Sequence, residues 1–189
     1  MRGRYVTLRP IEVSDAPDTF EWRHLDRARL LGGAPESVEA QREWIASRPA
    51  SEINWVIEVD GLAVGMVSLV DIDRRNRNAQ SARFLIGREE QVQGKPVAVE
   101  AMLLLYEYAF DTLGLHRIYG YIAAANAQMI KWQEYLGMRR EGVWREHLLD
   151  DAGEFADAVL LGLLESEYRD RARPRMQQML KMASLGEGN

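Results

Sequence analysis

The segment from residue 91 to residue 98 has the residue types that can hold an anion. It reads Gln91, Val92, Gln93, Gly94, Lys95, Pro96, Val97 and Ala98. Gly94 lets the backbone turn tightly, so that successive N–H groups can converge on one point. Pro96 suits the first position of a helix, where the aligned peptide dipoles attract negative charge. The pattern predicts a cradle for a pyrophosphate, and an ordinary strand-to-helix turn is the alternative.

Two predicted elements position this turn. Residues 81–86 form a short apolar stretch that favours a strand before it, and residues 96–112 favour a helix after it. The helix carries apolar side chains nearly all round, so we expect it to be buried. Gly114 is expected to end it as a C-terminal cap.

Apolar patterns and capping residues place the other elements. Helices are expected over residues 14–23, 37–46 and 126–136, and strands over residues 6–8, 55–59, 64–70, 117–122, 139–144 and 158–164. Asp60-Gly61 predicts a tight hairpin turn, and residues 150–154 an acidic loop. Strands that alternate with helices indicate an α/β (α+β) fold, in which helices cover both faces of a mixed sheet.

The chain is predicted to hold one domain, residues 1–168, followed by a C-terminal helical extension, residues 169–189. In this extension Pro174 is expected to end one helical stretch. Met176, Met179 and Leu180 recur at helical spacing in another stretch. This stripe is interpreted as a packing face or as the contact of a homodimer.

Composition excludes several classes of function. The formal net charge of -5 disfavours nucleic-acid binding, which needs concentrated Lys and Arg. The chain has no cysteine, so disulfides, a thiolate nucleophile and cysteine-ligated zinc are excluded, and its 3 histidines are not spaced to share a metal. The most apolar segment is interrupted by Glu100 and Glu107, so we expect a soluble, cytoplasmic protein without membrane contact.

One basic cluster stands out, formed by Arg74, Arg75 and Arg77. Asn and Asp surround these arginines, as is typical of a solvated hairpin tip. Contact with a phosphate of a bound cofactor is the alternative interpretation.

The order and spacing of these motifs resemble the Gcn5-related N-acetyltransferase (GNAT) superfamily, from about Tyr5 to Tyr168. That family binds the acetyl-CoA pyrophosphate through Arg/Gln-x-x-Gly-x-Gly/Ala after its fourth strand. Gln91 and Gly94 match this motif, whereas Pro96 departs from it. Residues 6–10 and 21–23 also resemble the branch that acetylates ribosomal-protein N-termini, amino sugars and other small amines.

The resemblance implies a central mixed, mostly antiparallel sheet of about seven strands, with its fourth and fifth strands splayed apart. Acetyl-CoA would lie in that gap as co-substrate and pair with main-chain groups of Phe84, Leu85 and Ile86. The implied binding set is completed by residues 91–98 and by the start of a later helix, with Asn126 beside the pantetheine arm and Met129 one turn on.

The resemblance implies direct attack of a neutral amine on the thioester, without a covalent enzyme intermediate. Many family members place a tyrosine acid seven residues after the pantetheine asparagine, and this chain has Gln133 there. Met129 stands where others have serine, and Ser81 where a glutamate is frequent. No side chain therefore inherits a clear acid or base role. Gln133 is predicted to donate a hydrogen bond to the sulfur, while water carries protons.

Three further residues are candidates for the acceptor side of the site. His147 precedes a loop that borders the acceptor in relatives, so it is a candidate substrate or base residue. Trp22 and Arg23 end the helix that flanks the acceptor in relatives. Core packing is the alternative for Trp22, and a salt bridge is the alternative for Arg23.

The sequence thus predicts an acetyl-CoA-dependent N-acetyltransferase. Its acidic balance favours a small cationic amine, such as an amino sugar, an aminoglycoside or a polyamine, as the acceptor. A protein N-terminus is the alternative within this enzyme class. A non-catalytic acyl-CoA-binding module is the alternative outside it, because the usual catalytic residues are absent.

Overall fold

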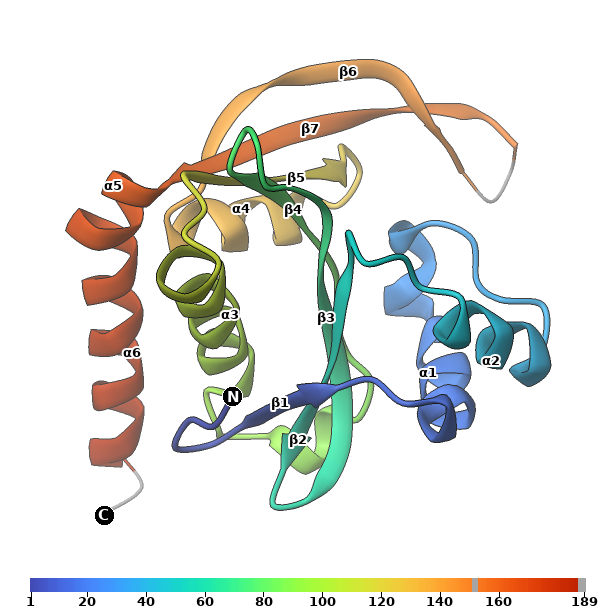
Figure 1. Ribbon diagram of the computed structural model, residues 1–189, viewed down its shortest axis with the longest axis horizontal. Helices are drawn as coiled ribbons and strands as arrows, with labels where there is room; N and C mark the ends of the chain where they lie inside the picture. The colour runs from blue at the N-terminus through green and yellow to red at the C-terminus, as the bar shows by residue number, and fades with distance from the viewer. Residues whose placement is uncertain (151–152, 187–189) are drawn as a thin grey trace.

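The computed structural model of the chain describes residues 1–150 and 153–186 and contains a seven-stranded sheet (Figure 1). Its strands are β1 (Thr7–Pro10), β2 (Ile53–Val59), β3 (Leu62–Asp73), β4 (Asn78–Ile86), β5 (Arg117–Ala123), β6 (Arg139–Leu149) and β7 (Phe155–Leu164). The order is β1-β2-β3-β4-β5-β7-β6, and β4 with β5 form the parallel pair of an otherwise antiparallel sheet. The predicted mixed, mostly antiparallel sheet is confirmed.

Helices lie between the strands and after the last of them. They are α1 (Ala16–Arg23), α2 (Val38–Ala46), α3 (Val97–Glu107), α4 (Ala127–Leu136), α5 (Glu165–Glu167) and α6 (Arg173–Gly186). Ser37 caps α2, because its Oγ accepts the N–H of Ala40 at 3.0 Å. Three 3-10 turns are η1 (Val13–Asp15), η2 (Asp26–Leu31) and η3 (Glu89–Val92), and the π turns η4 (Tyr108–Thr112) and η5 (Tyr168–Ala172) continue α3 and α5.

The helices cover both faces of the sheet (Figure 1). The larger apolar core lies between the sheet and the layer of α3, α4 and α6, and it includes Tyr106, Phe110 and Tyr168. A smaller cluster on the opposite face joins Trp22 of α1 to Met66 of β3 and Leu85 of β4. Residues 84 and 85 of β4 therefore face different layers, so that this strand is covered from both sides.

The C-terminal residues pack more closely than their sequence suggested. Pro174 does not end a helix, because it lies at the second position of α6, directly after the π turn. The helical backbone runs on from Glu165 to Gly186, and the π turn before Pro174 interrupts the regular α-helical hydrogen-bond ladder near the missing N–H of proline. Tyr168, Ala172 and Met176 are buried in the larger core, and α6 packs along α3. The division at residue 168 remains a prediction.

Several strand boundaries differ from expectation. The strands β6 and β7 are longer than predicted, because Leu148 pairs with Ala156 and Leu149 with Phe155 in an exposed hairpin. This ladder is stabilised by pairing across the hairpin, which local apolar alternation does not reveal. Of the predicted loop 150–154, residues 151 and 152 lie outside the described part of the chain. Within the described ranges, we find no helix that is long and apolar enough to cross a membrane.

Candidate active site

The parallel strands β4 and β5 separate shortly after they begin to pair. Their register covers Asn78–Gln80 against Arg117–Tyr119 and ends there. At the point of separation a Cβ added to Gly120 would lie 3.1 Å from the carbonyl oxygen of Ser81, so the strands still touch at this glycine. Beyond it the facing edges of the two strands are not paired with each other. The splayed pair that the family resemblance implied is confirmed.

A β-bulge in β4 lies beside this opening. Met66 of β3 faces Leu85, whereas Ser68 faces Ala82, so that two residues of β4 stand opposite one of β3. Arg83 is one of these two residues, and its φ of 55° lies in the left-handed region, which is unusual for a residue with a side chain. A bulge ends regular pairing and turns side chains to new directions. The bulge therefore changes the direction in which the Arg83 side chain and the neighbouring main-chain groups point.

Side chains of the bulged strand reach the helices on either face. Phe84 stacks on Trp132 of α4, with ring centroids 5.0 Å apart. Arg83 lies over the ring of Trp44 in α2, with its Cζ 5.0 Å from the centroid. The main chain at residues 84–86, predicted to pair with the pantetheine arm, thus lies between the two helical layers.

The predicted anion cradle lies between the end of β4 and the start of α3. Gly94 has φ 76°, and nothing lies within 4 Å of the position its Cβ would take. The helix begins at Val97, with Pro96 as its N-cap rather than its first helical residue as predicted. The difference is one residue at a helix end, where the backbone of Pro96 (ψ 43°) has not yet turned helical.

Several N–H groups of the cradle are available to an anion. Those of Val97, Ala98 and Val99 open α3, so they have no partner inside the helix, and no hydrogen bond to another described residue is found for them. Lys95 is engaged differently, because its N–H binds Val92 O at 3.1 Å and its Nζ lies 3.0 Å from Asp60 Oδ2. The open amides and the helix dipole fit a pyrophosphate.

A buried carboxylate that was not among the predicted site residues lies in the first turn of α3. Glu100 is 5% exposed, and it accepts backbone N–H groups from Arg4 (2.8 Å), Tyr5 (2.6 Å) and Val6 (2.7 Å). These donors satisfy the negative charge and fasten the N-terminal segment to α3. A charged residue inside an apolar helix was the available sequence signal.

The helix α4 presents the residues predicted to flank the pantetheine arm. Asn126 caps α4, because its Oδ1 accepts the N–H of Met129 at 3.2 Å. For the Asn126 Nδ2, no hydrogen bond is found within the described chain. The cap therefore orients this amide and leaves its donors for a ligand carbonyl.

Gln133 lies in the interior, at 7% exposure. Its Oε1 accepts a hydrogen bond from Tyr106 Oη at 3.1 Å. Burial raises the pKa of Tyr106, so this phenol stays neutral and donates. Because Tyr106 already occupies the Oε1 of Gln133, the amide N–H groups of Gln133 remain as hydrogen-bond donors. Tyr135, two residues further along α4, is 54% exposed.

His147 lies in an exposed aromatic cluster on the outer hairpin. Its ring centroid is 4.5 Å from that of Trp144 and 5.2 Å from that of Tyr121. None of these residues lines the cavity that lies between α1, α2 and the sheet. The structure therefore does not bring His147 together with Arg23.

A cavity of about 350 Å³ lies on the α1 and α2 face of the sheet. Its lining includes Arg23, Leu31, Pro35, Trp44, Met66 and Arg83. Arg83 comes from the β4 bulge, so the cavity reaches the sheet beside the opening between β4 and β5. Trp22 is 1% exposed and lies against Gly87, where a Cβ would collide with its ring, so it does not line the cavity.

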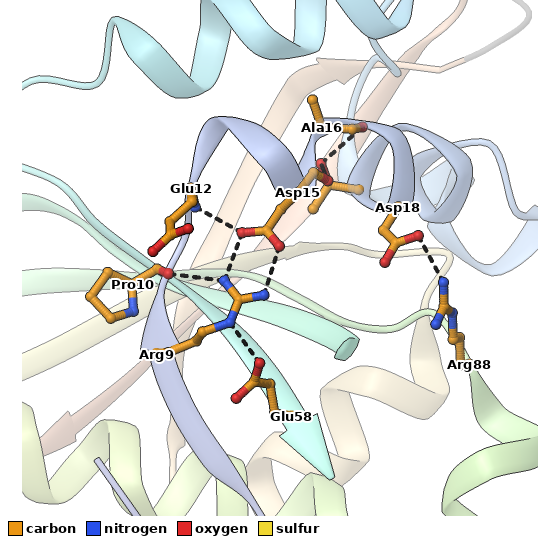
Figure 2. A network of polar contacts seen from close by, with 9 residues as sticks. Arg9, Pro10, Glu12, Asp15, Ala16, Asp18, Glu58 and Arg88 are labelled. Carbon is orange, nitrogen blue, oxygen red and sulfur yellow. Dashed lines mark hydrogen bonds and ion pairs between the residues drawn. The ribbon is translucent and has the colours of Figure 1, made fainter. Parts of the chain in front are cut away.

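A polar network holds α1, which carries Arg23, in place (Figure 2). Arg9 of β1 binds both carboxylate oxygens of Asp15 and, through Nε, Glu58 of β2, each at 2.7 Å. Arg88, just after β4, binds Asp18 of α1 at 2.7 Å. These ion pairs tie the sheet to the helix that borders the cavity.

The described residues contain no group of three or more His, Cys, Asp or Glu side chains that could hold a metal ion. Arg77, from the basic cluster, donates to the carbonyl oxygen of Gly114 at 2.8 Å, and residues 74–77 form the turn between β3 and β4. The predicted hairpin tip is thus present.

Comparisons with known proteins agree with this geometry. The family model "Acetyltransferase (GNAT) domain" matches residues 6–139. The spermidine N(1)-acetyltransferase of Escherichia coli (strain K12) is 30% identical over 132 residues, which cover 69% of this chain and 68% of the relative. YdaF of Bacillus subtilis (strain 168), named as a ribosomal N-acetyltransferase, is 28% identical over 177 residues, 88% of this chain and 94% of the relative.

A solved structure has the same architecture. A mutant form of the SpeG spermidine N-acetyltransferase from Vibrio cholerae superposes with a TM-score of 0.77 at 25% identity, and the match covers 90% of this chain and 99% of that one. The family match spans most of the sheet, the cradle and α4. This chain is therefore a member of the GNAT family of N-acetyltransferases, which use acetyl-CoA as co-substrate.

Proposed function

We propose that this chain transfers an acetyl group from acetyl-CoA to the primary amine of a small molecule. The observation that carries the proposal is the separation of β4 from β5 beside the open amides of α3. When bound, acetyl-CoA supplies an acetyl group that is activated as a thioester. The remaining task of the protein is to hold both reactants in contact and to keep them aligned.

The residues that would hold acetyl-CoA are those predicted from the sequence. The N–H groups of Gly94 and of residues 97–99 would face the pyrophosphate, while Asn126 at the start of α4 would contact the pantetheine arm. The main chain of residues 84–86 would pair with that arm in the opening between the strands. A backbone N–H at the bulge would donate to the thioester carbonyl oxygen.

Proton transfer in this proposal does not depend on a strong side-chain acid. Gln133 keeps its amide donors available because Tyr106 occupies its Oε1, so it can donate a hydrogen bond to the thiolate that leaves. Water would carry the proton taken from the amine. His147 remains a candidate base, although it lies outside the cavity lining.

Four observations bear on the acceptor. The net charge of -5 and the spermidine N(1)-acetyltransferase relative favour a small cationic amine. The relative named as a ribosomal N-acetyltransferase favours a protein N-terminus. The cavity beside Arg23, at about 350 Å³, has the size of a small-molecule site, so we propose a small amine.

A matched pair of glycine variants tests the cofactor site. Gly94 and Gly153 both have positive φ, 76° and 82°, and both have open space around the Cβ position. Gly94→Ala and Gly153→Ala therefore carry the same backbone strain in different places. Acetyl-CoA at about 100 times its Kd stabilises a protein by about 2.7 kcal/mol, which a thermal shift measures. We expect Gly94→Ala to weaken this shift and Gly153→Ala to preserve it.

Turnover separates the enzyme from a non-catalytic binding module. Release of CoA that depends on an added amine would support the enzyme. A thermal shift with acetyl-CoA but no amine-dependent CoA release would support the module. Acetylation of peptide N-termini in preference to small amines would show that the acceptor is a protein N-terminus.

A further inference from the structure

The cavity beside the strand opening has a lining that is cationic. Arg23 and Arg83 are its charged lining residues, and among the described residues no Asp or Glu belongs to the lining. The other walls are provided by apolar or uncharged residues, among them Leu31, Trp44 and Met66. A ligand in this cavity therefore meets two guanidinium groups and no carboxylate.

Arg23 has no acidic partner among the described residues. Its guanidinium donates to backbone carbonyls, with Nη2 at 2.8 Å from both Gly32 O and Gly33 O. Carbonyl oxygens satisfy hydrogen bonds, but they do not neutralise the positive charge. Burial lowers the pKa of Arg23, and the charge of Arg83 lowers it further. The positive charge of Arg23 therefore has no carboxylate beside it within the described chain.

Arg83 is fixed in place by a single carboxylate that it shares with another arginine. Its Nη1 lies 2.9 Å from Glu52 Oε2 and 3.0 Å from Asn54 Oδ1. Arg48 also approaches Glu52, at 3.6 Å, and its guanidinium lies over the ring of Trp44. Burial alone would raise the pKa of Glu52, but the hydrogen bond from Arg83 and the nearby positive charges lower it. Glu52 therefore stays ionised, and its one charge is shared between two arginines.

We propose that this cavity receives the acceptor and that Arg23 and Arg83 bind an acid group, a carboxylate or a phosphate, that the acceptor carries besides its amine. The inference rests on the function proposed above and narrows its acceptor class. The carbon chain of such an acceptor would lie against Trp44, Leu31 and Met66. Since Arg83 comes from the bulge, an acid group bound there would hold the amine near the strand opening.

The cationic lining disfavours a polycation in this cavity. Each ammonium group placed there would face guanidinium charges without a carboxylate on the described wall. An acid group would instead form charge-assisted, bidentate hydrogen bonds, for which the planar guanidinium is suited. An amine with an acid group can satisfy both arginines and still present a neutral nitrogen to the thioester.

A matched acceptor series tests the inference. It comprises an ω-amino acid, its carboxamide, the diamine with the same carbon chain, an aminoalkyl phosphate and spermidine. We expect the better of the two acid-bearing amines, the ω-amino acid or the aminoalkyl phosphate, to have a kcat/KM about tenfold or more above that of the diamine. Hydrogen bonds to charged groups provide a free-energy difference of this size. The better of the carboxylate and the phosphate identifies the acid group.

Variants separate acceptor binding from a role in folding. We expect Arg23→Gln and Arg83→Gln to raise KM for the acid-bearing amine by about tenfold, with little change in kcat or in KM for the carboxamide. Arg23→Lys should retain part of the preference, because the charge remains. Arg48→Gln is the control, because Arg48 contacts Trp44 and Glu52 but does not line the cavity. If Arg23 only holds the loop, KM for the acid and for the carboxamide should rise together, which would overturn the inference.

Other outcomes would also overturn it. Turnover of the diamine and spermidine ahead of both acid-bearing amines, unaffected by Arg23→Gln, would reject the inference and leave the N-acetyltransferase function standing. No turnover of any amine, with acetyl-CoA binding intact, would reject the proposed function itself and the inference with it.

Discussion

Arg9 and Asp15 meet through two hydrogen bonds, from Nη1 to Oδ2 and from Nη2 to Oδ1, both 2.7 Å long (Figure 2). The Asp15 carboxylate also accepts the N–H of Glu12 at 2.7 Å. This pair joins the first strand to the start of α1. The helix that borders the cavity is therefore anchored by electrostatics at one end and by the burial of Trp22 at the other.

Replacing Asp15 should destabilise the fold in a pH-dependent manner. Burial would raise the pKa of Asp15, but the hydrogen bonds from Arg9 and Glu12 and the Arg9 charge lower it overall. The carboxylate thus stabilises the folded state above its unfolded pKa of about 3.9, and this contribution is lost as the pH falls through the lower folded value. We expect Asp15→Asn to cost about 2 kcal/mol at neutral pH.

Urea unfolding at several pH values checks this prediction. The difference between the parent protein and Asp15→Asn should shrink as the pH falls from about 5 to below 3. A difference that is constant over this range would show that the ion pair does not account for the loss.

Removing the charge of Glu100 should release the N-terminal segment from α3. The carboxylate accepts three backbone N–H groups, so Glu100→Gln loses part of a charge-assisted set and places an N–H donor among other donors. We expect a loss of about 2–3 kcal/mol and faster hydrogen exchange of the Arg4, Tyr5 and Val6 amides.

Glu107→Gln is the control on the same helix. Glu107 is partly exposed and pairs with Arg173 at 3.3 Å, so its replacement should cost less than about 1 kcal/mol. Equal losses of unfolding free energy in Glu100→Gln and Glu107→Gln would show that the three backbone hydrogen bonds to Glu100 add no particular stability.

Gln133→Ala should lower kcat by less than about tenfold, because positioning of the reactants supplies most of the acceleration in the proposed mechanism. The variant also leaves the buried Tyr106 hydroxyl without its acceptor, at a cost of about 1–3 kcal/mol in stability. Steady-state kinetics and chemical unfolding measure the two effects separately.

Tyr106→Phe removes the same hydrogen bond and retains the Gln133 amide. We expect kcat of this variant to remain near that of the parent protein. A loss above about a thousandfold in Gln133→Ala, with Tyr106→Phe unaffected, would assign an essential role in proton transfer to Gln133.

His147→Ala should change kcat/KM by less than about threefold, because His147 lies in the exposed cluster with Tyr121 and Trp144 rather than on the cavity. The pH dependence of kcat/KM gives a sharper measurement than the rate alone. Loss of the acidic limb of the pH profile in the variant would establish His147 as the base.

Much of the fold could be predicted from short-range patterns. Gly94 and Gly114 mark turns, and Ser37 and Asn126 cap helices with their side chains, as their types predicted. These features depend on interactions between residues that are three or four positions apart, so the local sequence contains the required information. The strand-to-helix cradle was located for the same reason.

The other features of the fold and of the site depend on contacts between residues that are distant in the chain. Glu100 finds its donors about 95 residues away, and Arg83 acquires its place in the cavity through a bulge that is defined against β3. The outer hairpin extends beyond its predicted length because β6 and β7 pair with each other. No local pattern encodes such contacts, since they depend on which strands become neighbours.

The sequence by itself determined most of the elements, the turn from β4 into α3 and the family, because these rest on local backbone preference and on the spacing of a few residues. Only the tertiary structure decided what surrounds the cavity proposed for the acceptor. The acidic composition of the whole chain predicted attraction for cations, whereas folding brings Arg23 and Arg83 together on a wall whose described residues include no Asp or Glu. Net charge is summed over the surface, but recognition depends on the few charges within contact distance of the ligand.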